Sequence, residues 1–314
     1  MKKFFVLALL CSFFLISCKK EHYTPSTTFS FTDDLNRTVS VVQNAKTAVL
    51  QGSLAHAWIL AGGKLAGFSA DFLSEIADGA LNVEIGSAEN IGAMMSPSVE
   101  KLLSGEYDFV VLSAAIPQHK NVADTLNSAH IPCAYFKLDT FNDYVRVMQI
   151  FCKITDNKTA FEKNVLNVQT EIEKTVKTAK ETFSKSPRIL LLRASSAKVS
   201  SRSSRTDATG AMLQDLGCVN IADEKTGLLE DISLEKIILE DPDFIFVTTM
   251  GASDKAEAFL RTSFEENPAW NSLRAIQENR FFILPRNLFH YKPCEKWAEA
   301  YVYLFNILSK ETEK

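Results

Sequence analysis

One segment of this sequence gathers three arginines among small polar residues. The stretch "RASSAKVSSRSSRTD" holds Arg193, Arg202 and Arg205 and follows the apolar run "ILLL". Guanidinium groups bind carboxylates and phosphates through paired hydrogen bonds, so the segment predicts a site for an anionic ligand. A mobile, solvated loop is the alternative interpretation of the same composition.

Other side chains with useful chemistry lie near the ends of predicted strands. Imidazole and phenol groups can ligate iron, a Trp ring can stack on a flat ligand, and Met can line an apolar pocket. The candidate ligand-binding residues, besides the three arginines, are His56, Trp58, Met94, His290 and Tyr291. Trp58 at the head of a helix and Met94 within one can equally be core residues.

Catalytic and metal-binding motifs are missing from the sequence. It contains no G-x-S-x-G, no P-loop and no H-E-x-x-H. The adjacent carboxylates Asp33–Asp34 and Glu265–Glu266 are expected to face water. We therefore predict no enzyme activity, no catalytic residues and no cofactor. The histidines past residue 18 are too few for the His and carboxylate set of a zinc or manganese site, so no metal site is predicted; they are His22, His56, His119, His130 and His290.

The chain opens with two lysines and a short apolar run, "MKKFFVLALLCSFFLISC". A bilayer-spanning helix needs about 20 apolar residues, so residues 1–17 are predicted to be a secretory signal. The ending "LISC" resembles the lipobox of bacterial lipoproteins. This resemblance implies cleavage before Cys18, lipidation of that residue, and attachment to a bacterial membrane in the cell envelope. A cleaved signal with a chance Cys is the alternative. Residues 18–30 are polar and are predicted to be a tether.

The remaining composition indicates a globular body. Apolar residues make up 46% and charged residues 23% of the chain, and the length suffices for two domains. The net charge of −4 gives no electrostatic reason to expect nucleic acid as a partner. Disulfides within each half, Cys133–Cys152 and Cys218–Cys294, are possible, but sequence does not fix the pairing.

Each half of the body alternates short apolar runs with helical patterns. Strands are predicted at 47–50, 65–69, 108–113 and 133–136, and again at 188–193, 219–221, 243–248 and 280–284. Continuous apolar strands that alternate with helices are typical of parallel sheets covered on both faces. The predicted fold class is therefore α/β, with two α/β sandwich lobes.

A long amphipathic helix is predicted between the halves, over residues 157–184. Asn157 is a suitable N-cap, Glu173 and Lys177 can form a favourable pair, and Pro187 lies just beyond the end. Its apolar stripe comprises Phe161, Val165, Val168, Ile172, Val176, Ala179 and Phe183. The position of this helix favours a rigid strut that joins two lobes. A long surface helix or a coiled-coil arm is the alternative.

The sequence also repeats one helix–strand unit. "SVEKLLSGEYDFVVLSA" (98–114) and "SLEKIILEDPDFIFVTT" (233–249) align without a gap, which pairs Glu100 with Glu235 and Asp108 with Asp243. A Glu in the first turn of a helix favourably meets the helix dipole, and that is the ordinary explanation of both glutamates.

Four stretches in this order resemble the ABC-importer substrate-binding proteins that have two α/β lobes bridged by one rigid helix. They are "FTDDLNRTVSV", "VLQGSLAHAWILAGGKLAGFS", "TGAMLQDLGCVNIAD" and "PAWNSLRAIQENRFFILPRNLF". The resemblance implies lobes at 31–156 and 185–314, mostly parallel sheets, and capture of a ferric siderophore, haem or cobalamin in the cleft between the lobes. It also implies a monomer that delivers this ligand to a permease dimer and its ATPase.

In that family each lobe presents one Glu to one permease subunit, which by position implies docking roles for Glu100 and Glu235. Two alternative functions stay open at this point. One is the zinc or manganese importer component of a related branch, and the other is a structural surface lipoprotein with no transport role.

Overall fold

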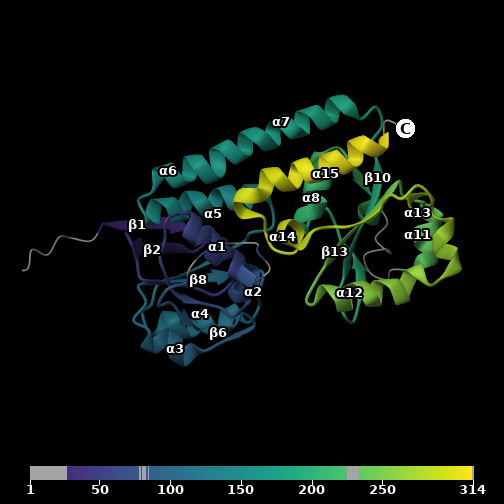
Figure 1. Ribbon diagram of the computed structural model, residues 1–314. Coiled ribbons are helices and arrows are strands. Elements are labelled where there is room, and N and C mark those ends of the chain that lie inside the picture. Colours follow the sequence, from purple (N-terminus) through teal and green to yellow (C-terminus); the bar gives the residue numbers. More distant parts are fainter. Residues whose placement is uncertain (1–26, 78, 80–82, 84, 225–232, 313–314) are drawn as a thin grey trace, which may run out of the picture.

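Figure 1 shows the computed structural model, in which two α/β lobes lie side by side beneath a long helix. The structure describes residues 27–77, 79, 83, 85–224 and 233–312. The predicted signal, Cys18 and most of the predicted tether lie outside these residues.

The N-terminal lobe is built on a five-stranded parallel sheet. Its strand order is β5 (Glu89–Asn90), β4 (Leu65–Phe68), β3 (Thr47–Val49), β8 (Phe109–Ser113) and β9 (Cys133–Phe136). The helices of this lobe are α1 (Gly52–Leu60), α2 (Asp71–Ala77), α3 (Val99–Ser104), α4 (His119–Ser128) and α5 (Phe141–Ile154). A hairpin of β1 (Thr28–Thr32) and β2 (Thr38–Val42) precedes this sheet, and a smaller hairpin joins β6 (Gly92–Ala93) to β7 (Ser96–Pro97).

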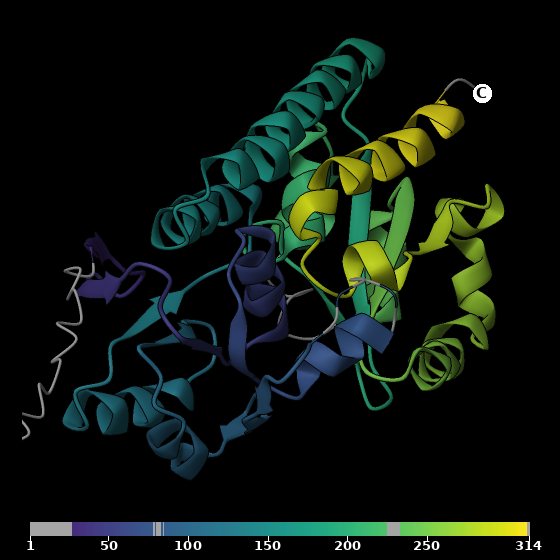
Figure 2. The same cartoon turned by 60° about the vertical axis from the view of Figure 1, so that its left-hand side comes forward.

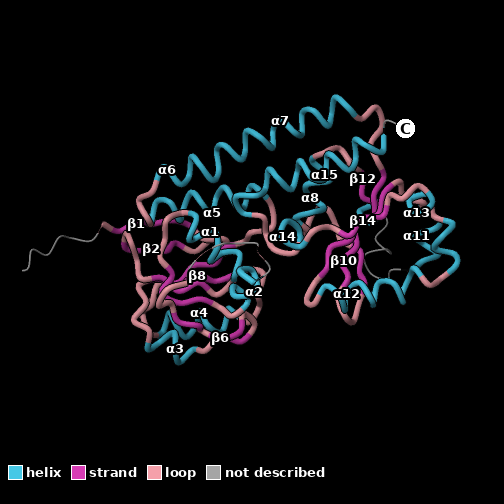
Figure 3. The backbone as a smooth tube through the Cα atoms, in the orientation of Figure 1, coloured by secondary structure: helices cyan, strands magenta, loops and turns pink. Residues whose placement is uncertain are grey.

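The C-terminal lobe repeats four of these five strands and adds one antiparallel strand; the strands of both lobes are magenta in Figure 3. Its strands are β10 (Arg188–Ala194), β11 (Val199–Ser201), β12 (Val219–Asn220), β13 (Phe244–Thr249) and β14 (Phe281–Ile283). Strands β12, β10, β13 and β14 pair in parallel, whereas β11 joins β10 antiparallel. The helices that matter below are α8 (Ala208–Asp215), α9 (Ile221–Glu224), α11 (Leu234–Glu240), α12 (Ser253–Leu260), α13 (Arg274–Gln277), α14 (Arg286–Phe289) and α15 (Trp297–Thr312), with single turns η2 (Arg261–Glu265), η3 (Pro268–Ser272) and η4 (Cys294–Lys296).

The strand predictions are confirmed in both halves, and the shared order β4-β3-β8-β9 and β12-β10-β13-β14 confirms two lobes with mostly parallel sheets. Strand β11 was missed. It lies within the arginine-rich segment, where β10 and β11 form a hairpin that buries Ser201. The segment is therefore partly built into the sheet edge, and its interpretation as a loop is wrong for residues 199–201.

One helical segment connects the lobes, as Figures 1 and 2 show, running from α6 (Lys158–Phe161) through a π-helical turn (Glu162–Leu166) into α7 (Asn167–Thr182). Asn157 caps it, since its Oδ1 accepts from the Ala160 N–H at 3.0 Å. The π-turn brings Asn164 to the N-terminal lobe, where its Nδ2 donates to the Leu60 carbonyl. The predicted stripe faces inward, and α15 packs along α7. The strut is thus fastened to both lobes.

A single apolar core runs from one lobe to the other. It combines one face of each sheet with α5, α7 and α15, and it includes Trp58, Ile172 and Trp297. Separate clusters cover the outer faces of the two sheets. A core that is continuous across the lobes opposes their relative motion, because opening them would expose apolar surface.

The four cysteines in the described body are free and buried. The disulfides considered above are therefore not formed, and Cys294 instead places its Sγ 3.6 Å from the Ser53 carbonyl. No helix among the described residues has the length and apolar character needed to cross a bilayer.

Candidate functional site

The two copies of the repeated unit begin with the same helix cap. Ser98 and Ser233 each accept a hydrogen bond from the backbone N–H three residues later, at 3.3 and 3.2 Å. Leu102 and Ile237, at matching positions, are fully buried against the outer faces of their sheets. The repeat in sequence therefore fixes two helices, α3 and α11, in equivalent places on the two lobes.

The two copies also end alike. Glu106 and Asp241, which are equivalent, both have left-handed backbone, with φ of 51° and 38°. Asp108 and Asp243 then each accept, at 2.8 Å, from the backbone N–H at the start of the neighbouring central strand. A chance similarity of apolar residues would not reproduce these shared backbone conformations and hydrogen bonds. The two units are therefore one structural motif used twice.

Glu100 and Glu235 are exposed on these helices. Neither carboxylate forms an ion pair or a side-chain hydrogen bond with another part of the chain that the structure describes, whereas the neighbouring Lys101 is held by Glu89 at 3.3 Å. Helices α3 and α11 lie at the outer edges of their lobes (Figure 1). Both glutamates are thus available to a partner.

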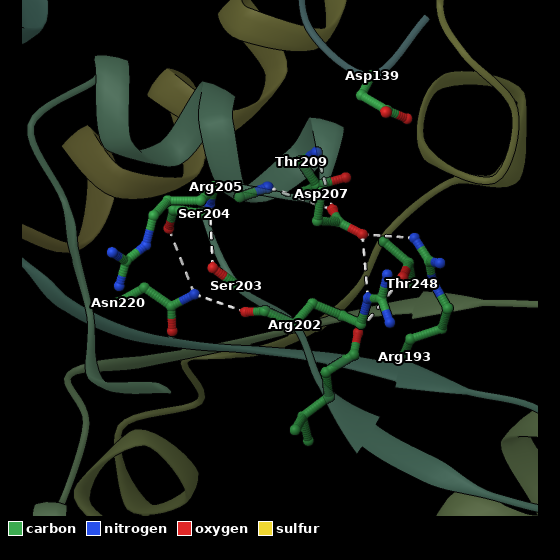
Figure 4. Close-up of polar contacts among 12 residues, drawn as sticks. Asp139, Arg193, Arg202, Ser203, Ser204, Arg205, Asp207, Thr209, Asn220 and Thr248 are labelled. Atoms are coloured by element: carbon green, nitrogen blue, oxygen red, sulfur yellow. Dashed lines mark hydrogen bonds and ion pairs between the residues drawn. The ribbon is translucent and has the colours of Figure 1, made fainter. Parts of the chain in front are cut away.

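Two of the three predicted arginines meet at one buried carboxylate. Asp207 caps α8 through Oδ1, which accepts from the N–H groups of Thr209 and Gly210. Its Oδ2 accepts from Arg193 at 2.5 Å and from Arg202 at 3.4 Å. Figure 4 shows both guanidinium groups converging on Asp207. The cluster carries one more positive charge than negative. Asp207 holds both guanidinium groups in place at the carboxyl end of β10.

The charge of this cluster is partly shielded from water. Burial lowers the pKa of Arg193, and the nearby positive charge of Arg202 lowers it further. The negative charge of Asp207 acts in the opposite direction and raises it. Arginine keeps its charge in proteins even so. Because the two side chains are still about 30% exposed, at 27% and 32%, they can offer N–H groups to a ligand without leaving Asp207.

The opposite lobe supplies Asp139 near the arginine cluster. Its carboxylate influences Arg193 electrostatically and lies across from the cluster in Figure 4. Lys292 of the C-terminal lobe reaches it, with Nζ 3.1 Å from Oδ1. The surface where the lobes face each other therefore carries an excess of cationic groups around one carboxylate from the N-terminal lobe.

His56 does not face this surface. It is 2% exposed, with Nε2 2.9 Å from Glu295 of the C-terminal lobe and Nδ1 4.0 Å from Glu75 of α2. Burial alone would raise the pKa of Glu295, but contact with His56 brings it below its ordinary value. Burial beside Asp71 raises the pKa of Glu75 to about 8. The expectation that His56 binds a ligand is wrong, because its ring fills the junction between the lobes.

The expectation that Trp58 stacks on a ligand is also wrong. Its indole is 1% exposed, packs against Phe109 and Phe151, and donates from Nε1 to the Lys64 carbonyl at 3.1 Å. It belongs to the core and has no face for a ligand to stack on.

The predicted residue Met94 is half-buried in the turn between β6 and β7 rather than within a helix. His119, fully buried, accepts from the Ser113 N–H at Nδ1 and donates from Nε2 to the Met94 carbonyl at 3.0 Å. Burial lowers the pKa of His119, so its ring is neutral. This histidine therefore holds the turn in place and orients Met94.

The last three predicted residues contact groups other than Asp207. Arg205 is exposed and its side chain extends away from Asp207 in Figure 4, toward the carbonyl of Asp223. His290 lies just after α14 and donates from Nδ1 to the carbonyl of Thr249, at the end of β13. The Tyr291 ring contacts it edge-on, with centroids 4.4 Å apart.

Sequence reasoning missed Asp207, Asp139, Lys292 and Met250. Asp207 carried a usable signal, since Asp directly before "ATGAM" is a strong N-cap. Met250 is 47% exposed directly after β13. Asp139 and Lys292 gave no signal, because their pairing joins residues far apart in the sequence.

A cavity of about 520 Å³ also lies between the lobes, beneath α7. Its walls come from both lobes and the strut, and include Phe141, Glu173, Asp215 and Trp297. None of the predicted ligand residues lines it. In the described ranges, no three His, Cys, Asp or Glu side chains are grouped so that they could hold a metal ion.

Comparison with known families decides the classification. The family model described as periplasmic binding protein matches residues 48–288. This chain belongs to that family. The predicted resemblance is thereby confirmed.

An iron-uptake system-binding protein of Bacillus subtilis is 22% identical to this periplasmic binding protein over 197 residues, which is 62% of this chain and 61% of the relative. The chain thus spans about three fifths of that relative's length.

Two solved structures share the fold. The S. aureus protein IsdE, complexed with heme, has a TM-score of 0.68 at 13% identity, covering 84% of this chain and 98% of its own. The Vibrio cholerae catecholate-siderophore binding protein VctP has a TM-score of 0.69 at 15% identity. The match covers 89% of this chain and 99% of VctP. Likeness at this identity confirms the two-lobed α/β architecture of this periplasmic binding protein.

Proposed function

We infer that this protein is the substrate-binding component of an ABC importer that captures an iron chelate (a ferric siderophore or haem) or cobalamin between its lobes. The chelate is cargo, so no resident cofactor is needed and no catalysis is involved. The observation that carries this proposal is the pair of guanidinium groups held by Asp207 opposite the N-terminal lobe. Such forks suit the carboxylate or phenolate oxygens of an anionic chelate.

The relatives favour the same class of ligand, since their names refer to iron uptake, heme and a catecholate siderophore. Zinc or manganese as cargo has no supporting group of ligands among the described residues. Within the proposed site, Arg193 and Arg202 contact the ligand's oxygens, Met94 and Met250 supply apolar walls, and Arg205, His290 and Tyr291 lie at its edge.

We further propose that Glu100 and Glu235 dock one lobe on each subunit of a permease dimer. A two-fold permease is best met by a carrier whose two lobes present the same charge in the same place. The duplicated caps and strand contacts support this role. Lipidation at Cys18 and attachment of the monomer to the envelope complete the proposal, and both rest on the sequence.

The ligand test is a titration of the purified protein with haem, cyanocobalamin and a ferric catecholate, followed by absorbance and thermal unfolding. A ligand present at 100 times its Kd should stabilise the folded state by about 2.7 kcal/mol. Replacing both arginines, R193Q with R202Q, should abolish this shift.

The matched control is R188Q. Arg188 stands at the other end of the same strand and has a similar exposure of 32%, but it pairs with Glu224 and Glu240. If none of the compounds stabilises the protein, and divalent metals also fail, the surface-lipoprotein alternative gains support instead.

A further inference from the structure

Helices α3 and α11 each expose a leucine beside the glutamate. Leu103 is 44% exposed and Leu239 is 83% exposed. Leu103 follows Glu100 by three residues and Leu239 follows Glu235 by four. Residues three and four apart share one face of a helix, so each lobe presents a carboxylate and a leucine on the same outward surface.

Scattered exposed leucines are common and need no explanation. Here, however, the two leucines lie in the two copies of one motif, and each stands next to an unpaired carboxylate. The exact equivalents differ: Ile238, which matches Leu103, is half-buried, and Ser104 matches Leu239. An exposed leucine is therefore present on both lobes although the positions differ by one residue. Simple duplication of a packing residue does not account for this.

We propose that each carboxylate–leucine pair (Glu100 with Leu103, and Glu235 with Leu239) forms one docking surface, whose partner is a permease subunit that offers an arginine beside an apolar pocket. The inference rests on the proposed docking function and adds the apolar half of the contact. The partner's chemistry follows from complementarity, since a carboxylate selects a cation and an exposed Leu gains by leaving water. An apolar contact beside the ion pair also excludes water and strengthens it.

The two pairs should contribute unequally. Leu239 has nearly all of its side chain to bury, whereas about half of Leu103 is already covered by its own lobe. Truncating Leu239 to Ser should weaken docking by about tenfold, and truncating Leu103 should weaken it by about threefold.

The test measures binding of the ligand-free protein to the importer's permease–ATPase complex in lipid nanodiscs, by biolayer interferometry. All variants carry Cys18→Ser, so that a lipid anchor cannot contribute. The variants are L103S, L239S, their combination, and E100K with E235K. The matched control is L166S, because Leu166 is 47% exposed on the strut, away from both docking helices.

Loss of affinity with the leucine variants but not with L166S supports the proposal. If E100K with E235K abolishes binding while L103S and L239S stay within twofold of the parent, the apolar contact is refuted and docking through the glutamates stands. If neither set changes binding, the docking role itself fails. Equal loss with L166S, or leucine-dependent binding to nanodiscs without the complex, also overturns the proposal, because the contact is then nonspecific or made with lipid.

Discussion

The two lobes agree at their outer edges and differ where they face each other. At the outer edges both carry the same capped helix and, at equivalent positions, an acidic residue with left-handed backbone. In both, an aspartate also accepts from the N–H at the start of the neighbouring central strand. At the facing surfaces the C-terminal lobe offers two arginines on one carboxylate, whereas the N-terminal lobe offers Asp139.

The function proposed above would place two separate demands on one duplicated fold. A permease with two-fold symmetry would require matching outer surfaces, and a cargo without that symmetry would require unlike inner surfaces. The buried carboxylates of the two lobes allow the separation to be tested.

The largest effects are expected from removing these carboxylates. Asp33 accepts from the N–H groups of Leu35, Arg37 and Tyr135 and from the Arg37 guanidinium, and Asp207 holds two arginines and caps α8. D33A and D207A should each lower the free energy of unfolding by about 3 kcal/mol, because polar partners are left unsatisfied. Urea unfolding measures this.

Only D207A should also change ligand binding, by about tenfold toward weaker affinity, since the two guanidinium groups lose their fixed position. The control D207N keeps a helix cap, because Asn also caps well, but loses the charge. D207N should lower the free energy of unfolding less than D207A does, and it should weaken ligand binding equally. Equal weakening of ligand binding by D33A would show that the lobes are not functionally separate.

A smaller difference is expected between the equivalent aspartates of the repeat. Asp108 and Asp243 make the same bond to a strand N–H, but only Asp243 also pairs with Arg274, at 2.7 Å, and it is the more buried. D243A should cost about 2 kcal/mol and D108A about 1 kcal/mol. Urea unfolding of both variants and of R274A checks the cause. If D243A and D108A cost the same, the ion pair contributes nothing.

The features that sequence predicted are those set by local patterns. Continuous apolar runs such as "FVVL" and "FIFV" predicted parallel strands, the spacing of Val165 and Ile172 predicted the strut, and the ungapped repeat predicted matching helices. Asn157 as a cap followed from its residue type alone.

Predictions failed where contacts join distant parts of the chain. The junction of His56 with Glu295 and the pairing of Asp139 with Lys292 bring together residues from opposite lobes. Trp58 was ambiguous, because the same residue type serves a core and a stacking surface, and only the packing against Phe109 and Phe151 decides between them. Strand β11 was hidden by its small polar residues, which are equally common in loops.

The last effect concerns pH at the junction between the lobes, where Glu75 of the N-terminal lobe is buried. Glu75 lies against Ser53 and His56 of α1 and Asp71 of its own helix. His56 in turn contacts Glu295 across the junction. The Glu75 pKa of about 8 in the folded state lies above the ordinary value of 4.5. The folded protein therefore keeps a proton that the unfolded chain releases, so stability falls as pH rises from about 4.5 through about 8.

Between pH 7 and pH 9 this group should remove about 1.4 kcal/mol from the free energy of unfolding. E75Q, which is neutral at every pH and keeps the shape of the side chain, should lack this loss. E100Q, which removes a carboxylate that is exposed on α3, should retain the loss of stability. Urea unfolding at both pH values gives the comparison. If E75Q and the unaltered protein lose the same stability, the titrating group lies elsewhere.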